Sequence, residues 1–173
     1  MERRHISFLL FLFSAISVTV PAQDRYRSTI DTVFQSSSLQ QEQHILIVLP
    51  NEYQSGATNA FPLILIPGNP EKNGNQLLRE TVNYLTENNQ IPASIMVFTS
   101  VDPATEQTSV DKENLLTIQQ QELFLINELI PFIRQHYSGT EVTILAGQQQ
   151  YADLCLQLVS LHPENIQGVI ADN

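Results

Sequence analysis

The stretch Glu141-Val-Thr-Ile-Leu-Ala-Gly-Gln-Gln-Gln-Tyr-Ala152 joins an apolar segment to a helical one through a short turn. Glu141 to Ala146 has the composition of a buried strand, and Gln149 to Leu161 has the apolar spacing of a helix. Gly147 lies at the junction, where a tight turn needs a small residue. A buried strand that runs directly into a helix is typical of α/β domains. We therefore expect this strand to lie inside a mostly parallel sheet.

The segments around this junction alternate between strand and helix. The predicted strands are 28–34, 43–49, 61–67, 93–98 and 167–171, and the further helices are 75–88 and 115–136. The first two strands are joined by a Ser/Gln-rich turn, which predicts an antiparallel hairpin. The later alternation predicts parallel strands with helices on both faces. The expected fold is a three-layer α/β/α sandwich that begins with an antiparallel hairpin.

The predicted helix Leu115 to His136 carries two local expectations. Its buried stripe is expected to consist of four apolar residues at helical spacing, Leu123, Ile126, Ile130 and Ile133. Pro131 removes one backbone donor and is expected to kink the helix. The polar segment Val101 to Asn114 before it is long enough to be a lid or to border a site, although it is equally consistent with a surface connection.

The N-terminal residues are typical of a secretory signal peptide. Arg3 and Arg4 precede a short apolar run, and Val20-Pro21-Ala22 offers small residues for cleavage after Ala22. The run is shorter than the roughly 20 residues that span a bilayer, although a retained anchor is the alternative. We therefore expect a signal peptide over 1–22, one incomplete domain over 23–173, and export to the periplasm or the extracellular space.

The composition excludes several kinds of partner and site. A hydrophobic content of 42% indicates a globular chain, and the net charge of -10 disfavours binding to nucleic acid or, after signal cleavage, to an anionic membrane. The single cysteine, Cys155, excludes an intrachain disulfide. The four histidines lack metal-ligand spacing, so we expect no metal and no cofactor.

In order and spacing, several short segments resemble the esterase branch of the α/β hydrolases, which contains esterase D and enterochelin-esterase-like proteins. The resemblance extends from about Ser38 to Asn173. The most specific element is Glu128-Leu-Ile-Pro-Phe-Ile-Arg-Gln-His-Tyr137, because it has a proline inside a helix just before the central strand. The other landmarks are Leu49 to Tyr53, Phe61 to Gly68, Ile91-Pro92, His162-Pro163 and Gly168 to Ala171.

The resemblance implies a nucleophile elbow of the form Gly-x-Ser-x-Gly at Gly147, Gln148, Gln149, Gln150 and Tyr151. Gln149 would replace the serine, and a carboxamide cannot form an acyl-enzyme. Tyr151 would replace the second glycine, where it is expected to crowd the turn and relax the elbow. Oxyanion-hole amides would survive near Gly68 and Gln150.

The other members of a Ser-Asp/Glu-His triad would follow the nucleophile in the chain, but the sequence ends after one more strand. His162 lies about 13 residues from Gln149, which is roughly 20 Å along a helix. His136 is expected at the opposite edge of the sheet. A relocated nucleophile has candidates in Ser100 and Cys155, but Ser100 has no acid–histidine pair nearby in the sequence, and Cys155 lies on an apolar helix face. The carboxylates of Asp102, Asp111 and Glu113 fit a solvated loop.

Three hypotheses follow from the sequence. The first is a secreted hydrolase-like protein without catalysis, which binds a ligand or partner that the sequence does not identify. The second is a carboxylic-ester hydrolase with a relocated nucleophile or a site completed by a second chain. The third is the remnant of a longer gene. An open apolar edge at the last strand would further predict a protein partner or self-association.

Overall fold

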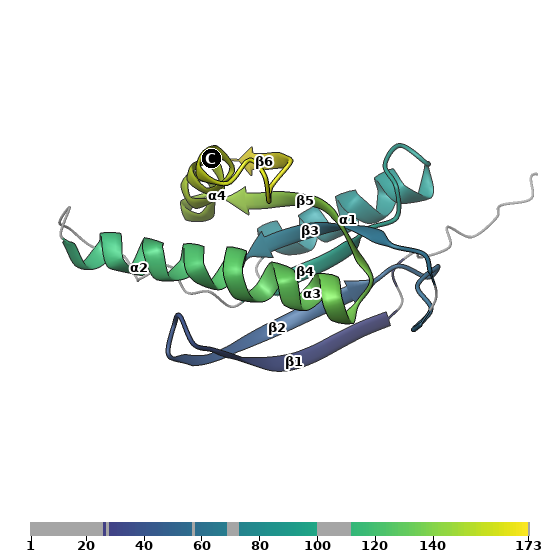
Figure 1. Ribbon diagram of the computed structural model, residues 1–173. Helices are drawn as coiled ribbons and strands as arrows, with labels where there is room; N and C mark the ends of the chain where they lie inside the picture. The colour runs from purple at the N-terminus through teal and green to yellow at the C-terminus, as the bar shows by residue number, and fades with distance from the viewer. Residues whose placement is uncertain (1–25, 27, 57, 69–72, 100–111, 173) are drawn as a thin grey trace, which may run out of the picture.

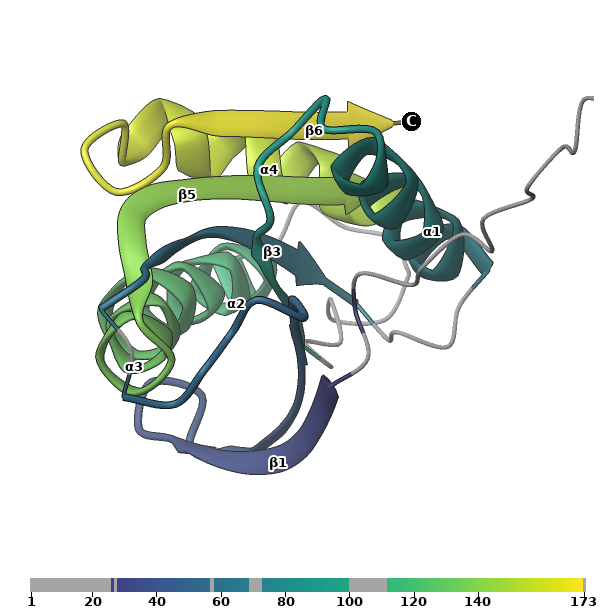
Figure 2. The same ribbon diagram turned by 90° about the vertical axis from the view of Figure 1, so that its right-hand side faces the viewer.

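The computed structural model describes residue 26 and residues 28–56, 58–68, 73–99 and 112–172 of the chain. The described part contains a six-stranded sheet in the order β1-β2-β4-β3-β5-β6. The strands are β1 (Ser28–Ser36), β2 (Gln41–Leu49), β3 (Phe61–Pro67), β4 (Ile95–Thr99), β5 (Gly139–Gln148) and β6 (Gly168–Asp172). The sheet twists from the β1 edge to the β6 edge (Figure 2).

The strand pairing confirms the predicted arrangement. β1 and β2 form an antiparallel hairpin, and β2 pairs antiparallel with β4. From β4 onward, β3, β5 and β6 join in parallel. The carboxyl ends of these four strands therefore lie along one edge of the sheet, which is where such folds bind ligands.

The helices cover the sheet on opposite faces, with α1 (Asn73–Glu87) on one side and α2 (Lys112–Leu123) to α3 (Ile130–His136) on the other (Figure 1). The larger core lies on the α2–α3 face, where α4 (Gln150–Leu161) also packs through Leu154, Cys155 and Leu158. A smaller core lies under α1 and contains Val82 and Phe98. This layering confirms the predicted α/β/α sandwich.

The long helix departs from the expected stripe at its centre. A π-helical segment, η1 (Phe124–Leu129), separates α2 from α3, and the backbone N–H of Ile130 donates to the carbonyl of Leu125. One wider turn rotates the side chains that precede it relative to those that follow. Ile126, Ile130 and Ile133 are buried as predicted, but Leu123 is 45% exposed, so its predicted burial is wrong. Pro131 lies in the first turn of α3, directly after this wider turn.

Among the described residues, no helix is long and apolar enough to cross a membrane. The predicted signal peptide over 1–22 and most of the polar segment from Val101 lie outside the described residues.

Candidate functional site

Three strand ends meet at the carboxyl edge of the sheet and define the candidate site. Gly68 follows β3, Thr99 ends β4, and Gln149 lies between β5 and α4. The backbone N–H of Gly68 donates to the carbonyl of Thr99 at 2.7 Å, which fixes the ends of β3 and β4 together. The backbone N–H of Gln149 donates to the carbonyl of Asp172 at 2.7 Å, which ties the turn to the end of β6.

Gln149 has the strained backbone of a sharp strand-to-helix turn. Its φ is 53° and its ψ is -124°, and its side chain makes no capping hydrogen bond to α4. A residue other than glycine in such a conformation costs about 1–3 kcal/mol and persists only where its surroundings hold it. The expectation that the turn relaxes is therefore wrong, because the sharp geometry remains although the serine and the second glycine are absent.

Gly147 allows β5 and α4 to lie in direct contact. A methyl group added at Gly147 would lie 2.5 Å from the carbonyl oxygen of Tyr151 and 2.7 Å from the sulfur of Cys155. Both distances are far inside van der Waals contact, and the first involves backbone, which cannot rotate away. The helix therefore rests directly on the strand at this glycine, as the elbow pattern requires.

Tyr151 is accommodated without crowding the turn, contrary to the expectation from its size. Its side chain is 7% exposed and lies against Gly68, where an added methyl group would approach the ring to 2.9 Å. The same methyl group would lie 3.0 Å from Nδ2 of Asn75, a buried residue of α1. Gly68, with a φ of 119°, thus supplies the space that Tyr151 fills.

Gln148 reaches from β5 to the first turn of α1. An added methyl group at Gly74 would overlap the carboxamide oxygen of Gln148. The first turn of a helix carries backbone N–H groups without partners inside the helix, and it favours oxygen atoms nearby. Gln148 is therefore half-buried against α1, whereas the neighbouring Gln149 is exposed.

The two expected oxyanion-hole amides differ in availability. The Gly68 amide is already bound to the Thr99 carbonyl. Gln150 is the first residue of α4, where a backbone N–H has no acceptor within the helix. The positive end of the α4 dipole therefore faces the turn, with one amide in the place where the resemblance puts an oxyanion donor.

The fold is similar to that of solved structures of esterases. No protein-family model and no curated protein matches the sequence. A ferulic acid esterase from Anaeromyces mucronatus is 19% identical with a TM-score of 0.66, over 83% of this chain and 57% of the esterase. An IroE-like serine hydrolase from Shewanella oneidensis is 14% identical with a TM-score of 0.67, over 82% and 49%. The enterobactin esterase of Shigella flexneri is 15% identical with a TM-score of 0.60, over 87% and 38%.

The chain has an α/β-hydrolase fold. At these identities the likeness shows the fold alone, and this chain spans between about two fifths and three fifths of the length of these proteins. The sharp strand-to-helix turn is present at Gln149, with a carboxamide where the resemblance places a hydroxyl.

His136 and His162, which were weighed as triad members, lie away from the turn at Gln149. His162 caps the far end of α4 and bonds Oε1 of Glu122 through Nε2 at 2.7 Å. His136 ends α3, and its Nδ1 lies 2.9 Å from the carbonyl of Phe132. His44 is exposed on β2. Within the described part of the chain, no group of three histidine, cysteine or carboxylate residues can hold a metal.

The two candidates for a relocated nucleophile, Ser100 and Cys155, and the loop carboxylates differ in whether the structure describes them. Ser100, Asp102 and Asp111 lie outside the described residues, and Glu113 is described only as part of the α2 backbone. Cys155 is fully buried beneath the elbow, as its apolar helix face predicts. Sequence reasoning missed Asn75, although an asparagine in the first turn of a predicted helix at the carboxyl edge was a usable signal.

Burial makes the Cys155 thiol unreactive. It raises the pKa of Cys155 to about 12, so roughly one thiol in 10,000 is ionised at pH 8. We expect the native protein to react with a disulfide reagent at least about 100-fold more slowly than the urea-unfolded protein. Absorbance of the released thiolate measures both rates. Equal rates in the two states would show that Cys155 is accessible.

Replacing Gln149 by glycine should stabilise the protein. Glycine adopts a positive φ without strain, and the exposed Gln149 side chain contributes no packing that would be lost. After the added freedom of the unfolded chain, we expect a gain of about 1 kcal/mol in urea unfolding. The matched control is Gln148→Gly in the adjacent strand position, which should lose about 1 kcal/mol. A lower free energy of unfolding in both variants would show that the backbone at Gln149 is not strained.

Proposed function

We propose that this chain is a secreted protein of the α/β-hydrolase fold that works by binding and not by hydrolysis. The single observation that carries the proposal is the strained elbow with Gln149 at its apex. The surroundings maintain a costly turn, yet the side chain that the turn presents is a poor nucleophile. Tyr151 and Asn75 further fill the space beside Gly68, next to the turn.

The test is catalytic turnover and covalent labelling. We expect no hydrolysis of p-nitrophenyl acetate or butyrate above the background rate, and no labelling by a fluorophosphonate probe. An active serine esterase serves as the positive control in both assays. Turnover that disappears in Ser100→Ala would overturn the proposal and establish a relocated nucleophile.

The second candidate is a carboxylic-ester hydrolase whose site is completed by another chain. The observation that favours it is the α4 N-terminus, which still directs an amide toward the turn. Labelling that depends on protein concentration, and that Gln149→Gly leaves unchanged, would support this candidate over the noncatalytic one.

Export follows from the predicted signal peptide and remains part of the proposal. Expression of the whole chain in a bacterial host should deliver it outside the cytoplasm with a new N-terminus at Gln23. N-terminal sequencing of the fractionated protein measures this. An unprocessed chain in the membrane fraction would show a retained anchor.

The outer edge of β6 is proposed as a site of self-association. Among the described strands, β6 pairs only with β5, and the apolar side chain of Ile170 on β6 is 49% exposed. An open edge with apolar side chains tends to pair with another chain. We expect dimers or larger species at micromolar concentration in light scattering, and monomers for Ile170→Lys. A monomeric parent protein would contradict this.

A further inference from the structure

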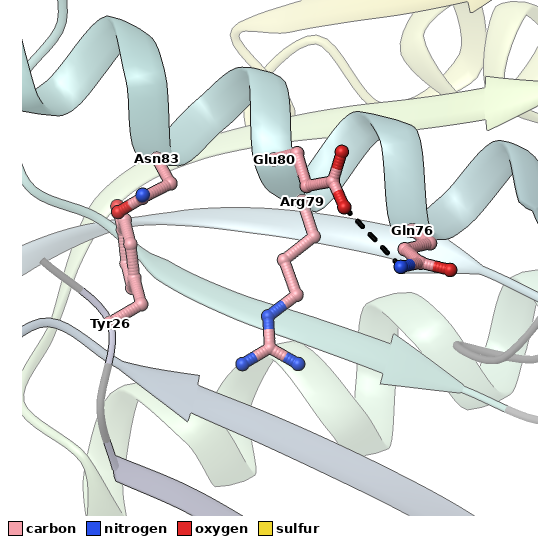
Figure 3. Close-up of a pocket in the computed structure, with 5 residues that line it drawn as sticks. All are labelled: Tyr26, Gln76, Arg79, Glu80 and Asn83. Carbon is pink, nitrogen blue, oxygen red and sulfur yellow. Dashed lines mark hydrogen bonds between the residues drawn. The ribbon is translucent and has the colours of Figure 1, made fainter. Parts of the chain in front are cut away.

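A small cavity lies along one face of α1. Its volume is about 220 Å³, and it is lined by Tyr26 and by four residues of α1, Gln76, Arg79, Glu80 and Asn83 (Figure 3). The α1 residues are spaced three and four apart, so they share one face of the helix. The wall opposite them comes from Tyr26, which lies about 50 residues earlier in the chain.

Arg79 brings to this cavity a positive charge that forms no ion pair with the described residues. Its side chain is half-buried, and no carboxylate of the described residues lies within ion-pair distance of its guanidinium. Arg134, by contrast, is paired with Glu141 at 2.9 Å. In Figure 3 the Arg79 guanidinium extends past the helix into the space between Tyr26 and Gln76, while the Glu80 carboxylate turns toward Gln76. Nε2 of Gln76 donates to that carboxylate at 3.3 Å.

Tyr26 forms a fixed and neutral wall. Its hydroxyl lies 3.3 Å from Oγ1 of Thr86 and accepts the backbone N–H of Ser94 at 3.2 Å. The side chain is 2% exposed, and burial raises the pKa of Tyr26 above its ordinary value. The phenol therefore stays uncharged at neutral pH and does not repel an anion. A wall held from two directions is also organised before any ligand arrives, which lowers the cost of binding.

We propose that this cavity binds a small organic carboxylate through Arg79. A planar guanidinium matches a carboxylate with two parallel hydrogen bonds, and a partly buried one loses little further hydration on binding. The cavity is somewhat larger than the roughly 150 Å³ cavity that holds benzene in an engineered protein, so a ligand of about the size of benzoate fits.

Charge on the rim selects monoanions. Glu80 lines the same cavity, and the whole chain has a net charge of -10. A second negative charge on the ligand would face the Glu80 carboxylate at close range and the general negative field at long range. A carboxylate monoanion is therefore preferred over a dicarboxylate and over phosphate, which carries more than one charge near neutral pH.

Titration of the purified full chain with benzoate, followed by calorimetry or by amide chemical shifts, tests the proposal. We expect a dissociation constant on the order of 1 mM, with at least tenfold weaker binding of benzamide, phthalate and inorganic phosphate. Arg79→Gln should weaken benzoate binding at least tenfold, and Arg79→Lys should weaken it less because the charge remains. Glu80→Gln should reduce the difference in affinity between benzoate and phthalate, because it removes the negative charge that faces the second carboxylate.

The matched control is Glu42→Gln, which removes one negative charge from an exposed position on β2 outside the cavity and should leave benzoate binding unchanged. Circular dichroism and thermal unfolding establish that each variant is folded. Equal binding of benzoate by the parent chain and Arg79→Gln would overturn the proposal. The absence of any heat or chemical-shift change at a benzoate concentration ten times the expected dissociation constant would also overturn it. Tighter binding of phosphate than of benzoate would do the same.

Discussion

Gly147→Ala is expected to lower the free energy of unfolding by about 3 kcal/mol. The added methyl group would lie 2.5 Å from the Tyr151 carbonyl oxygen and 2.7 Å from the Cys155 sulfur. Relief requires α4 to move away from β5, which would also disturb the packing of Leu154 and Leu158 in the larger core. Without the clash, alanine would be more favourable than glycine inside a strand. A lower free energy of unfolding would therefore come from the clash. Urea unfolding followed by circular dichroism measures it.

Two further variants separate this clash from a general effect of alanine. In Gly168→Ala on the neighbouring strand β6, the methyl group would meet Ile144 at 3.6 Å, which is ordinary contact, so we expect little change. Combining Gly147→Ala with Cys155→Ala removes the sulfur contact but leaves the backbone contact, so only part of the loss should return. Full recovery in the double variant, or an unperturbed single variant, would contradict the close approach of helix and strand.

The order of strands and helices was predictable because each element carries its own pattern. The continuous apolar run of β3 and the alternation in β1 identify strands without reference to their neighbours. The position of the elbow was predictable for the same reason, since Gly147 ends an apolar strand immediately before a helical spacing. These are local signals, and the folded chain follows them.

The details that the sequence did not predict depend on contacts between distant residues. Tyr151 has a place only because Gly68, more than 80 positions earlier, lacks a side chain. Leu123 is exposed because the π-helical segment after it changes the helical register, which a regular spacing cannot reveal. The Arg79 cavity likewise needs Tyr26 opposite α1. No periodicity contains such information, so these features appear only in three dimensions.

Glu128→Leu is expected to destabilise the protein by about 3 kcal/mol. Glu128 belongs to η1 and receives three hydrogen bonds from the turn of the β1–β2 hairpin. The Ser36 hydroxyl donates at 2.8 Å, and the Ser38 backbone N–H and hydroxyl donate at 2.8 and 2.7 Å. Leucine keeps the approximate volume but leaves the buried Ser36 hydroxyl and the Ser38 amide without their acceptor. The hairpin would thereby lose its polar attachment to the helical layer.

The same contacts predict how stability depends on pH. Burial alone would raise the pKa of Glu128, but the hydrogen bonds from Ser38 and Ser36 outweigh it and hold the pKa below its ordinary value of 4.5. A carboxyl group with a lowered pKa in the folded state stabilises the protein above its unfolded pKa and loses that contribution as pH falls through the folded pKa. The free energy of unfolding should therefore decrease as pH falls below about 5.

Glu128→Gln isolates this contribution, because it keeps one carbonyl acceptor and removes the titrating group. The variant should be less stable than the parent chain at pH 7, and the difference should shrink as pH falls toward 3. Glu42→Gln changes an exposed carboxylate on the same hairpin and should follow the parent chain at every pH. Urea unfolding at intervals between pH 7 and pH 3 measures all three proteins. A constant difference across that range would show that Glu128 acts through shape alone, because a charge-assisted contact must weaken once the carboxylate takes up its proton.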